Sequence, residues 1–258
     1  AGALASLLED QGVAVVRVTT AEAARDALYD AEGGSTLLVA AELSPISEEM
    51  ADVATQQRPA HLVLLGADAT TLELLAPWAR TDGFALPGED GPEEVDPACA
   101  WDLATRVGPL AAEGQLYATS AQRTSSCWGG YVLDLPEGVT GDPATTLVGS
   151  GSLLTNDVLA DSGNAALGMN LLGRDATVVW WLPSYTDPLQ AGGIDEPVAI
   201  SDLVPPWVGI ALAQAVVALL VAVWWRGRRL GRVVVEPLPV VVRATETAEG
   251  RGRLYRRS

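Results

Sequence analysis

Two cysteines and one histidine are the residues of this sequence best suited to covalent chemistry. Cys99 and Cys127 lie 28 positions apart, and an even cysteine count favours a disulfide if the domain is outside the cytoplasm. Closing a loop of this length would stabilise the fold by roughly 3.6 kcal/mol on the chain-entropy model. The alternative is a thiol nucleophile at Cys127, which needs a neighbouring base to form the thiolate.

The only histidine does not supply that base in a recognisable pattern. His61 opens an apolar segment far upstream, and no histidine follows Cys127, as the order of a cysteine-then-histidine triad requires. We therefore interpret His61 as a structural residue at a strand edge and predict no catalytic residue. One histidine and one cysteine pair serve a zinc site poorly, and no phosphate loop or Gly-x-Ser-x-Gly elbow occurs, so neither a metal nor a cofactor is predicted.

A glycine- and serine-rich segment after a predicted strand is the other candidate site. Residues 149–157 begin like a dinucleotide-binding fingerprint but lack its third glycine. In a parallel sheet this segment would emerge at the carboxyl edge, where ligands usually bind. The alternative interpretation is turn and helix-cap chemistry. The polar residues that could gather around a ligand or partner are Ser150, Ser152, Asn156, Asp157, Asp161 and Asn164.

Short apolar segments alternate with segments of helical pattern along residues 1–183. The predicted helices cover residues 3–10, 20–31, 47–56, 71–79 and 164–172. The predicted strands cover residues 13–18, 36–40, 62–65, 115–118, 131–135, 146–148 and 177–182. Residues 81–97, rich in acidic residues, proline and glycine, are predicted to be an exposed loop. Continuously apolar strands between amphipathic helices indicate an α/β fold with a doubly wound, mostly parallel sheet of the flavodoxin-like type.

Residues 207–225 form an uncharged apolar segment with a single amide, Gln214. As a helix these 19 residues would span roughly 28 Å, which matches the hydrocarbon core of a bilayer. The alternative is a buried helix of a soluble protein, but such helices seldom run so long without a charged face. Tryptophan and arginine at the ends are typical of membrane interfaces. The residues expected there are Trp207, Trp224, Trp225, Arg226, Arg228, Arg229 and Arg232.

The arginines also predict an orientation. Because short cytoplasmic flanks are enriched in arginine, we expect the tail, residues 226–258, in the cytoplasm and the domain, residues 1–183, outside the plasma membrane. Residues 184–206, rich in proline and glycine, are predicted to be a stalk between them. Since the first residues already fit a helix, we expect a signal peptide or a first transmembrane helix upstream.

Charge is divided unevenly along the chain. Residues 1–206 carry 7 Arg against 30 Asp and Glu, whereas residues 207–258 carry 9 Arg against 3 Glu, so their formal charges are about −23 and +6. A domain this acidic repels phosphate backbones, so nucleic-acid binding is not expected. The basic flank attracts anionic lipid head groups, which makes the lipid bilayer a predicted partner.

The tail has a pattern that suits docking to a protein partner. Residues 236–239 read Glu-Pro-Leu-Pro and are expected to be extended, because each proline disfavours helix in the preceding residue. The valines at 240–242 could then add to the sheet edge of a partner. The alternative interpretation is a disordered tail beside the membrane. The candidate docking residues are Glu236, Pro237, Pro239, Arg243, Arg253 and Tyr255.

Three parts of the sequence carry a resemblance to a known family: residues 149–173, the helix from Trp207 after Val-Pro-Pro, and residues 228–257. In these parts the chain resembles the actinobacterial membrane proteins of domain of unknown function 4350. The resemblance implies an α/β domain related to glutamine-amidotransferase-like sheets without their catalytic residues, held between two transmembrane helices. Members are often encoded beside a MoxR-type AAA ATPase and a von Willebrand A-like protein. Similar domains occur in auxiliary subunits of gliding-type transporters.

The leading hypothesis is a membrane-anchored, non-enzymatic binding or scaffold protein, in a cell-envelope assembly or a system with a MoxR-type AAA ATPase. The scarcity of catalytic residues beside a patterned tail motivates it. One alternative is an envelope hydrolase or amidase that uses Cys127 or the acidic residues near Asn156. Another is an accessory subunit of a transporter.

Overall fold

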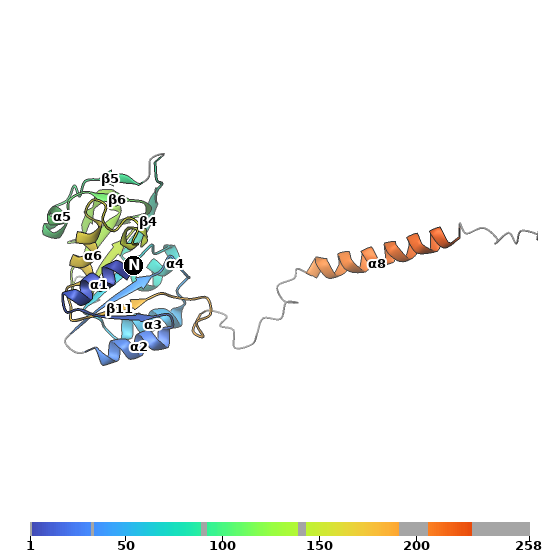
Figure 1. Ribbon diagram of the computed structural model, residues 1–258, viewed down its shortest axis with the longest axis horizontal. Helices are drawn as coiled ribbons and strands as arrows, with labels where there is room; N and C mark the ends of the chain where they lie inside the picture. The colour runs from blue at the N-terminus through green and yellow to red at the C-terminus, as the bar shows by residue number, and fades with distance from the viewer. Residues whose placement is uncertain (1, 32–33, 89–91, 139–142, 191–205, 229–258) are drawn as a thin grey trace, which may run out of the picture. The chain divides into compact units, whose positions relative to one another are not determined.

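The computed structural model describes residues 2–31, 34–88, 92–138, 143–190 and 206–228. The chain divides into two compact units, Ala1–Pro197 and Val198–Ser258. The first unit contains an α/β fold and the second contains helix α8, Pro206–Gly227 (Figure 1).

Seven strands form the main sheet of the first unit. They are β1 Ala14–Val18, β2 Ser35–Ala40, β3 His61–Leu65, β8 Ser125–Cys127, β9 Val132–Leu135, β10 Ala144–Val148 and β11 Thr177–Trp181. Their order across the sheet is β1-β11-β2-β3-β10-β9-β8. The first five in this order are parallel, whereas β9 pairs antiparallel with β10, and edge strand β8 pairs antiparallel with β9. The predicted α/β fold with a mostly parallel sheet is therefore confirmed.

Helices cover both faces of this sheet (Figure 1). They are α1 Gly2–Asp10, α2 Ala21–Asp30, α3 Glu48–Gln56, α4 Ala69–Leu75, α5 Asp102–Val107 and α6 Asn164–Leu172. Helices α1, α5 and α6 share one buried cluster with the sheet, and α2, α3 and α4 share another. Because successive strand residues point to opposite faces, Leu38 joins the cluster of α1, while its neighbour Leu37 joins that of α3. The sheet is doubly wound, as predicted.

Helices α2, α3 and α4 each begin at a residue whose side chain caps the first turn. The hydroxyls of Thr20 and Ser47 accept hydrogen bonds from the third residue of α2 and α3, at 3.3 and 3.2 Å. The carboxylate of Asp68 accepts one from Thr71 N at the start of α4, at 2.8 Å. Such caps satisfy amide groups that have no partner inside the helix and so fix where each helix begins.

The segment between α4 and β9 folds into two small sheets, which corrects the prediction of a loop over residues 81–97. Strand β4, Ala79–Ala85, pairs antiparallel with β7, Gly114–Thr119, and β5, Glu93–Val95, pairs with β6, Leu110–Ala112. The strand predicted at residues 115–118 is confirmed as β7, but local composition gave no sign of β4, β5 and β6, because each depends on a partner 15 or more positions away. A bulge between Thr81 and Gly83 also interrupts the alternation expected of a strand.

Helix α4 is shorter than predicted. It ends at Leu75, whereas the apolar pattern continues to residue 79. Ala76 leaves the helical conformation, with φ −148° and ψ 58°, because the ring of the following Pro77 disfavours helix in the residue before it.

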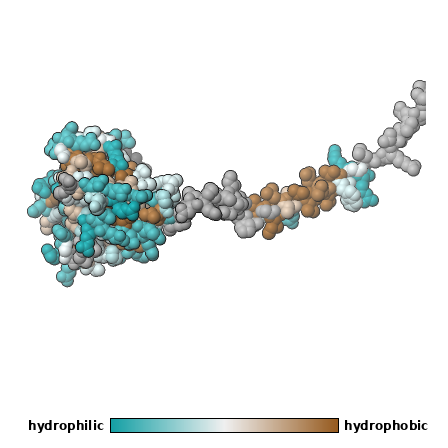
Figure 2. All heavy atoms as spheres, turned by 90° about the horizontal axis from the view of Figure 1, so that it is seen from below, coloured by the Kyte–Doolittle hydropathy of each residue, from teal (hydrophilic) through white to brown (hydrophobic). Residues whose placement is uncertain are grey.

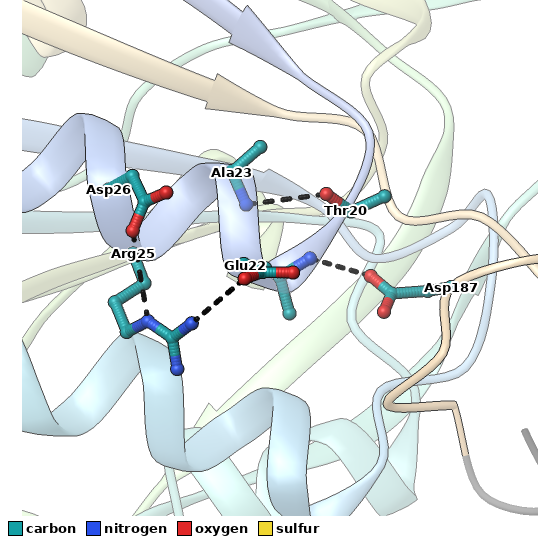
Figure 3. A network of polar contacts seen from close by, with 7 residues as sticks. Thr20, Glu22, Ala23, Arg25, Asp26 and Asp187 are labelled. Atoms are coloured by element: carbon teal, nitrogen blue, oxygen red, sulfur yellow. Dashed lines mark hydrogen bonds and ion pairs between the residues drawn. The ribbon is translucent and has the colours of Figure 1, made fainter.

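The first residues of the predicted stalk pack on the α/β domain. Asp187 is 1% exposed, and its carboxylate accepts a hydrogen bond from Ala21 N at 2.6 Å, beside the Thr20 cap of α2 (Figure 3). The hydroxyl of Ser47 donates to the carbonyl of Leu189. Residues 184–190 therefore belong to the same compact structure as β11, and residues 191–205 lie outside the described residues.

Helix α8 is long and apolar enough to cross a membrane, and within the described residues it is the one helix that meets this test. It presents apolar side chains along its length (Figure 2), and Trp207, Trp224 and Trp225 are each more than half exposed. The guanidinium of Arg228 lies 4.9 Å from the Trp224 ring centroid. Arg229, Arg232 and the docking candidates of the tail lie outside the described residues.

Candidate ligand site at the carboxyl edge of the sheet

The carboxyl ends of β2, β3 and β10 meet at one edge of the main sheet. After β3 the chain turns to α4 on one face, and after β10 it turns through the 3-10 helix η2, Ser152–Leu154, to α6 on the other face. Strands β3 and β10 are hydrogen-bonded neighbours. Ligands of open parallel sheets usually bind where adjacent strands send their connections to opposite faces, so this edge is the natural place for a site.

The carboxylate of Glu42, just after β2, bridges to the segment after β10. It accepts hydrogen bonds from Gly151 N at 3.1 and 3.0 Å and from the Ser150 hydroxyl at 3.1 Å. Two glycines leave room for it, because a Cβ at Gly66 or Gly151 would lie 2.7 or 2.6 Å from a Glu42 oxygen. Gly66 also has φ +60°, a conformation that favours glycine. The backbone at this edge thus leaves space for one charged side chain, that of Glu42.

Two buried tyrosines lie beneath this contact. The Tyr117 hydroxyl donates to the carbonyl of Ala67 at 3.1 Å, and the Tyr131 hydroxyl donates to that of Ser150 at 3.5 Å. Burial raises the pKa of both hydroxyls, and the charge of Glu42 raises it further. Both tyrosines are therefore neutral at physiological pH, and they support the edge as hydrogen-bond donors.

A cavity of about 290 Å³ opens beside Glu42. The loops after β2, β3 and β11 form it, and its lining residues are Ala41, Glu42, Ser44, Pro45, Gly66, Asp68 and Tyr185. Ser44 is 1% exposed, and its hydroxyl has no hydrogen-bond partner among the described residues. Buried hydroxyls are normally paired, so this one is an exception within the described part of the chain.

The residues predicted from the segment after β10 do not gather at this cavity. Of the six, Ser150 contacts Glu42, and its hydroxyl also accepts from Ser152 N at 3.0 Å. Asn156 accepts from Ala3 N at the start of α1, at 3.0 Å. Asn164 is fully buried at the start of α6 and donates to the Val158 carbonyl at 2.9 Å. Asp157 and Asp161 are exposed.

Four residues of the cavity were not singled out from the sequence: Glu42, Ser44, Asp68 and Tyr185. A signal was present, because each follows a predicted strand by two to four positions. The carboxyl ends of parallel strands meet at one edge, so the residues just after every apolar strand are candidates for a shared site. Spacing within one segment could not reveal this set, because the set is drawn from three loops.

Cys99 and Cys127 form a disulfide with their Cα atoms 5.2 Å apart. Cys127 is 1% exposed, and the bond joins the segment before α5 to edge strand β8. Neither cysteine of the chain is a free thiol in this structure. A thiolate nucleophile at Cys127 would first require reduction of this bond.

His61 lies at the opposite, amino edge of the sheet. Its Nδ1 is 2.8 Å from an Asp175 carboxylate oxygen, which also accepts a hydrogen bond from the Thr36 hydroxyl at 2.8 Å. Nearby, buried Asp134 accepts from the Thr146 hydroxyl at 2.8 Å, and burial raises the pKa of Asp134. These polar groups satisfy one another, so His61 has the structural surroundings of a paired strand-edge residue.

A second hollow, of about 560 Å³, lies between α5 and α6, where Trp101, Arg106 and Arg174 are among its lining residues. Arg106 is in the last turn of α5, and Arg174 donates to the Asn170 carbonyl at the end of α6, at 3.3 Å. Cations at helix carboxyl ends offset the helix dipole, which accounts for both arginines without a ligand. Among the described residues no group of three or more His, Cys, Asp or Glu could hold a metal ion.

Comparison with known proteins gives one family and one curated relative. The family described as "Domain of unknown function (DUF4350)" matches residues 1–172. An uncharacterized membrane protein of Mycobacterium tuberculosis is 35% identical over 257 residues, which cover 98% of this chain and 63% of the relative. The chain thus spans less than two thirds of that relative's length. No solved structure matches.

Proposed function

The chain belongs to the DUF4350 family of membrane proteins, and from this premise we propose that it is a membrane-anchored, non-enzymatic binding protein. The observation that carries the proposal is the carboxyl-edge cavity. It has a charged side chain held by hydrogen bonds, Glu42, and an exposed aromatic ring, Tyr185, at its border. Its described lining residues include no histidine, cysteine or lysine, which suits recognition better than bond cleavage.

In the proposed arrangement α8 crosses the plasma membrane, the α/β domain lies outside the cytoplasm and the tail lies inside. The arginines from Arg226 onward support this orientation, because positive flanks are retained on the cytoplasmic side. The disulfide supports it too, because such bonds persist in oxidising compartments. Cleavage of the tail by a protease added to intact cells would contradict this arrangement.

The tail would then contact a cytoplasmic partner while the outer domain recognises a second molecule. The sequence Glu-Pro-Leu-Pro at residues 236–239 and the arginines after it support a protein partner, for which a MoxR-type AAA ATPase of a cell-envelope assembly is our specific proposal. Deletion of residues 228–257 should abolish its recovery from native membranes. Undiminished recovery would argue against tail docking.

Site-specific photo-crosslinking in native membranes tests the role of the outer domain. A photoreactive phenylalanine analogue placed at Tyr185, 65% exposed at the cavity, should give a discrete adduct. The matched control is the same analogue at Tyr29, which is 81% exposed on α2. No adduct at Tyr185, or the same adducts at both positions, would contradict partner recognition through the cavity.

A further inference from the structure

Residues 184–190 form a strap that carries the chain from the end of β11 across the starts of α2 and α3. Its central residue, Asp187, accepts hydrogen bonds from Ala21 N at 2.6 Å and from Leu189 N at 2.9 Å (Figure 3). Ala21 N is the first amide of α2, where the helix dipole favours a carboxylate. The Ser47 hydroxyl, which caps α3, donates to the Leu189 carbonyl. Polar contacts at two helix starts thus hold the strap.

Apolar packing contributes little to this attachment. Of the seven strap residues only Asp187 is buried, and Leu189 packs partly buried against the cluster of α2 and α3. A cavity of about 240 Å³ remains between the strap and α2, with Arg25 and Pro188 among its lining residues. Strand β11, by contrast, pairs on both sides and buries four of its five residues. Segments with few buried apolar contacts open at a lower free energy than the core, so the strap should open before the sheet unfolds.

The position of Tyr185 at the carboxyl-edge cavity depends on this attachment. Asp187 N donates to the Ser184 carbonyl at 3.0 Å, and Thr186 N donates to the Ser184 hydroxyl at 3.2 Å, so residues 184–187 form a turn. Tyr185 lies inside the turn and lines the cavity beside Glu42. Because the turn is anchored at Asp187, release of Asp187 from α2 would let the Tyr185 ring leave the cavity.

From these contacts we propose that the strap is a two-position element, with Asp187 as its positioning residue, that couples the cavity to the connection with α8. The docked strap presents Tyr185 at the cavity. The released strap withdraws this ring and adds its seven residues to the connection that leads to α8, which lengthens the reach of that connection by up to about 24 Å.

Such coupling acts in both directions. A partner bound against Tyr185 would favour the docked strap, and tension on the connection to α8 would favour release and weaken binding at the cavity. The coupling to recognition rests on the proposed binding function, whereas the two positions of the strap do not.

Hydrogen exchange of the full chain in lipid nanodiscs tests the two positions. In the wild type, residues 184–190 should exchange faster than β11. Asp187→Ala should speed exchange of the strap about a hundred-fold and leave β11 unchanged, because it removes both hydrogen bonds to a charged acceptor. Asp187→Asn keeps one oxygen acceptor and should speed it about ten-fold. Asp26→Ala, an exposed carboxylate on α2 that lies 3.9 Å from Arg25, is the matched control and should exchange like the wild type.

The photoreactive analogue at Tyr185 tests the coupling in the same variants. The yield of its adduct should fall about five-fold or more in Asp187→Ala and stay at the wild-type level in Asp26→Ala. Should Asp187→Ala also speed exchange of β11, the domain has lost its fold, and the milder Asp187→Asn carries both measurements.

The outcomes separate this inference from the proposed function. Exchange of the strap only as fast as that of β11, or exchange that Asp187→Ala and Asp187→Asn leave unchanged, would overturn the two-position strap. Faster strap exchange with an undiminished adduct would overturn the coupling and leave partner recognition intact. No adduct in the wild type, together with strap release in Asp187→Ala, would refute recognition at the cavity and retain the two positions of the strap.

Discussion

The two edges of the main sheet both collect polar residues, yet they differ in what those residues leave unsatisfied. At the amino edge, His61, Asp175 and Thr36 pair with one another at 2.8 Å. At the carboxyl edge, Glu42 is equally well bound, but a cavity of about 290 Å³ opens beside it. A polar cluster alone therefore does not distinguish a binding site from structural pairing. Open space beside the cluster does.

The difference follows from how the chain leaves each edge. At the carboxyl edge the connections after β3 and β10 go to opposite faces, so the space between them is not filled by either helix. Glycines line this space, and a Cβ at Gly66, Gly149 or Gly151 would collide with a neighbouring atom. Four substitutions test whether the two edges really play different roles.

The largest effect is expected from Gly149→Ala at the carboxyl edge. A Cβ there would lie 2.3 Å from the Gln115 carbonyl oxygen and 2.4 Å from the Tyr131 ring, and neither neighbour can move freely. Overpacking of this kind should cost about 3 kcal/mol or more and lower the melting temperature by about 10 °C. Gly2→Ala, whose nearest contact is an ordinary 3.8 Å, should leave thermal unfolding unchanged. Equal melting temperatures would show that the edge is looser than described.

Asp175→Ala at the amino edge should have the next largest effect. It leaves His61 Nδ1 and the Thr36 hydroxyl without their shared acceptor, which should reduce the free energy of unfolding by about 1–2 kcal/mol. Because this edge is structural in our interpretation, the adduct formed by the photoreactive analogue at Tyr185 should not change. A lost adduct with unchanged stability in denaturant titrations would reverse the roles of the two edges.

Asp134→Asn should change the dependence of stability on pH. Burial raises the pKa of Asp134 in the folded protein, so the folded state holds this proton more tightly than the unfolded chain. Its stabilising contribution is complete below the unfolded pKa and is lost as pH rises through the folded pKa. Asparagine keeps an acceptor for Thr146 and does not titrate, so its stability relative to the wild type should increase across this window. A constant difference in unfolding free energy from pH 3 upward would show that folding does not shift the pKa of Asp134.

The smallest change in stability is expected from Glu42→Gln. Glutamine keeps one oxygen acceptor for Gly151 N, so the free energy of unfolding should change by less than about 1 kcal/mol. The same substitution should weaken the adduct at Tyr185, because it removes the charge from the same cavity, and this would separate function from folding at this edge. A loss of several kcal/mol in denaturant titrations would assign Glu42 to structure, like Asp175.

The sequence by itself determined the features that depend on local pattern and composition. The apolar segments became β2, β3, β10 and β11, because continuous apolar runs are stable only where both faces of a strand are buried. The predicted strand at the edge of the sheet, β1, formed as well, although it is largely exposed. The Thr20 cap, the α/β class and an apolar helix after residue 206 were likewise predictable, since each is encoded within a few neighbouring residues. Pro77 could also have predicted the early end of α4.

Tertiary structure alone decided which of these residues meet. Glu42 contacts Gly151 across 109 positions, and Asp187 reaches Ala21 across 166, distances that no local pattern encodes. Strand β4 forms because β7 pairs with it, although its own sequence suggested a loop. The order β2-β3-β10 brings three loops to one edge, and that order is set by the packing of the whole sheet. The cavity is therefore a property of the fold, built from residues that are unremarkable in the sequence.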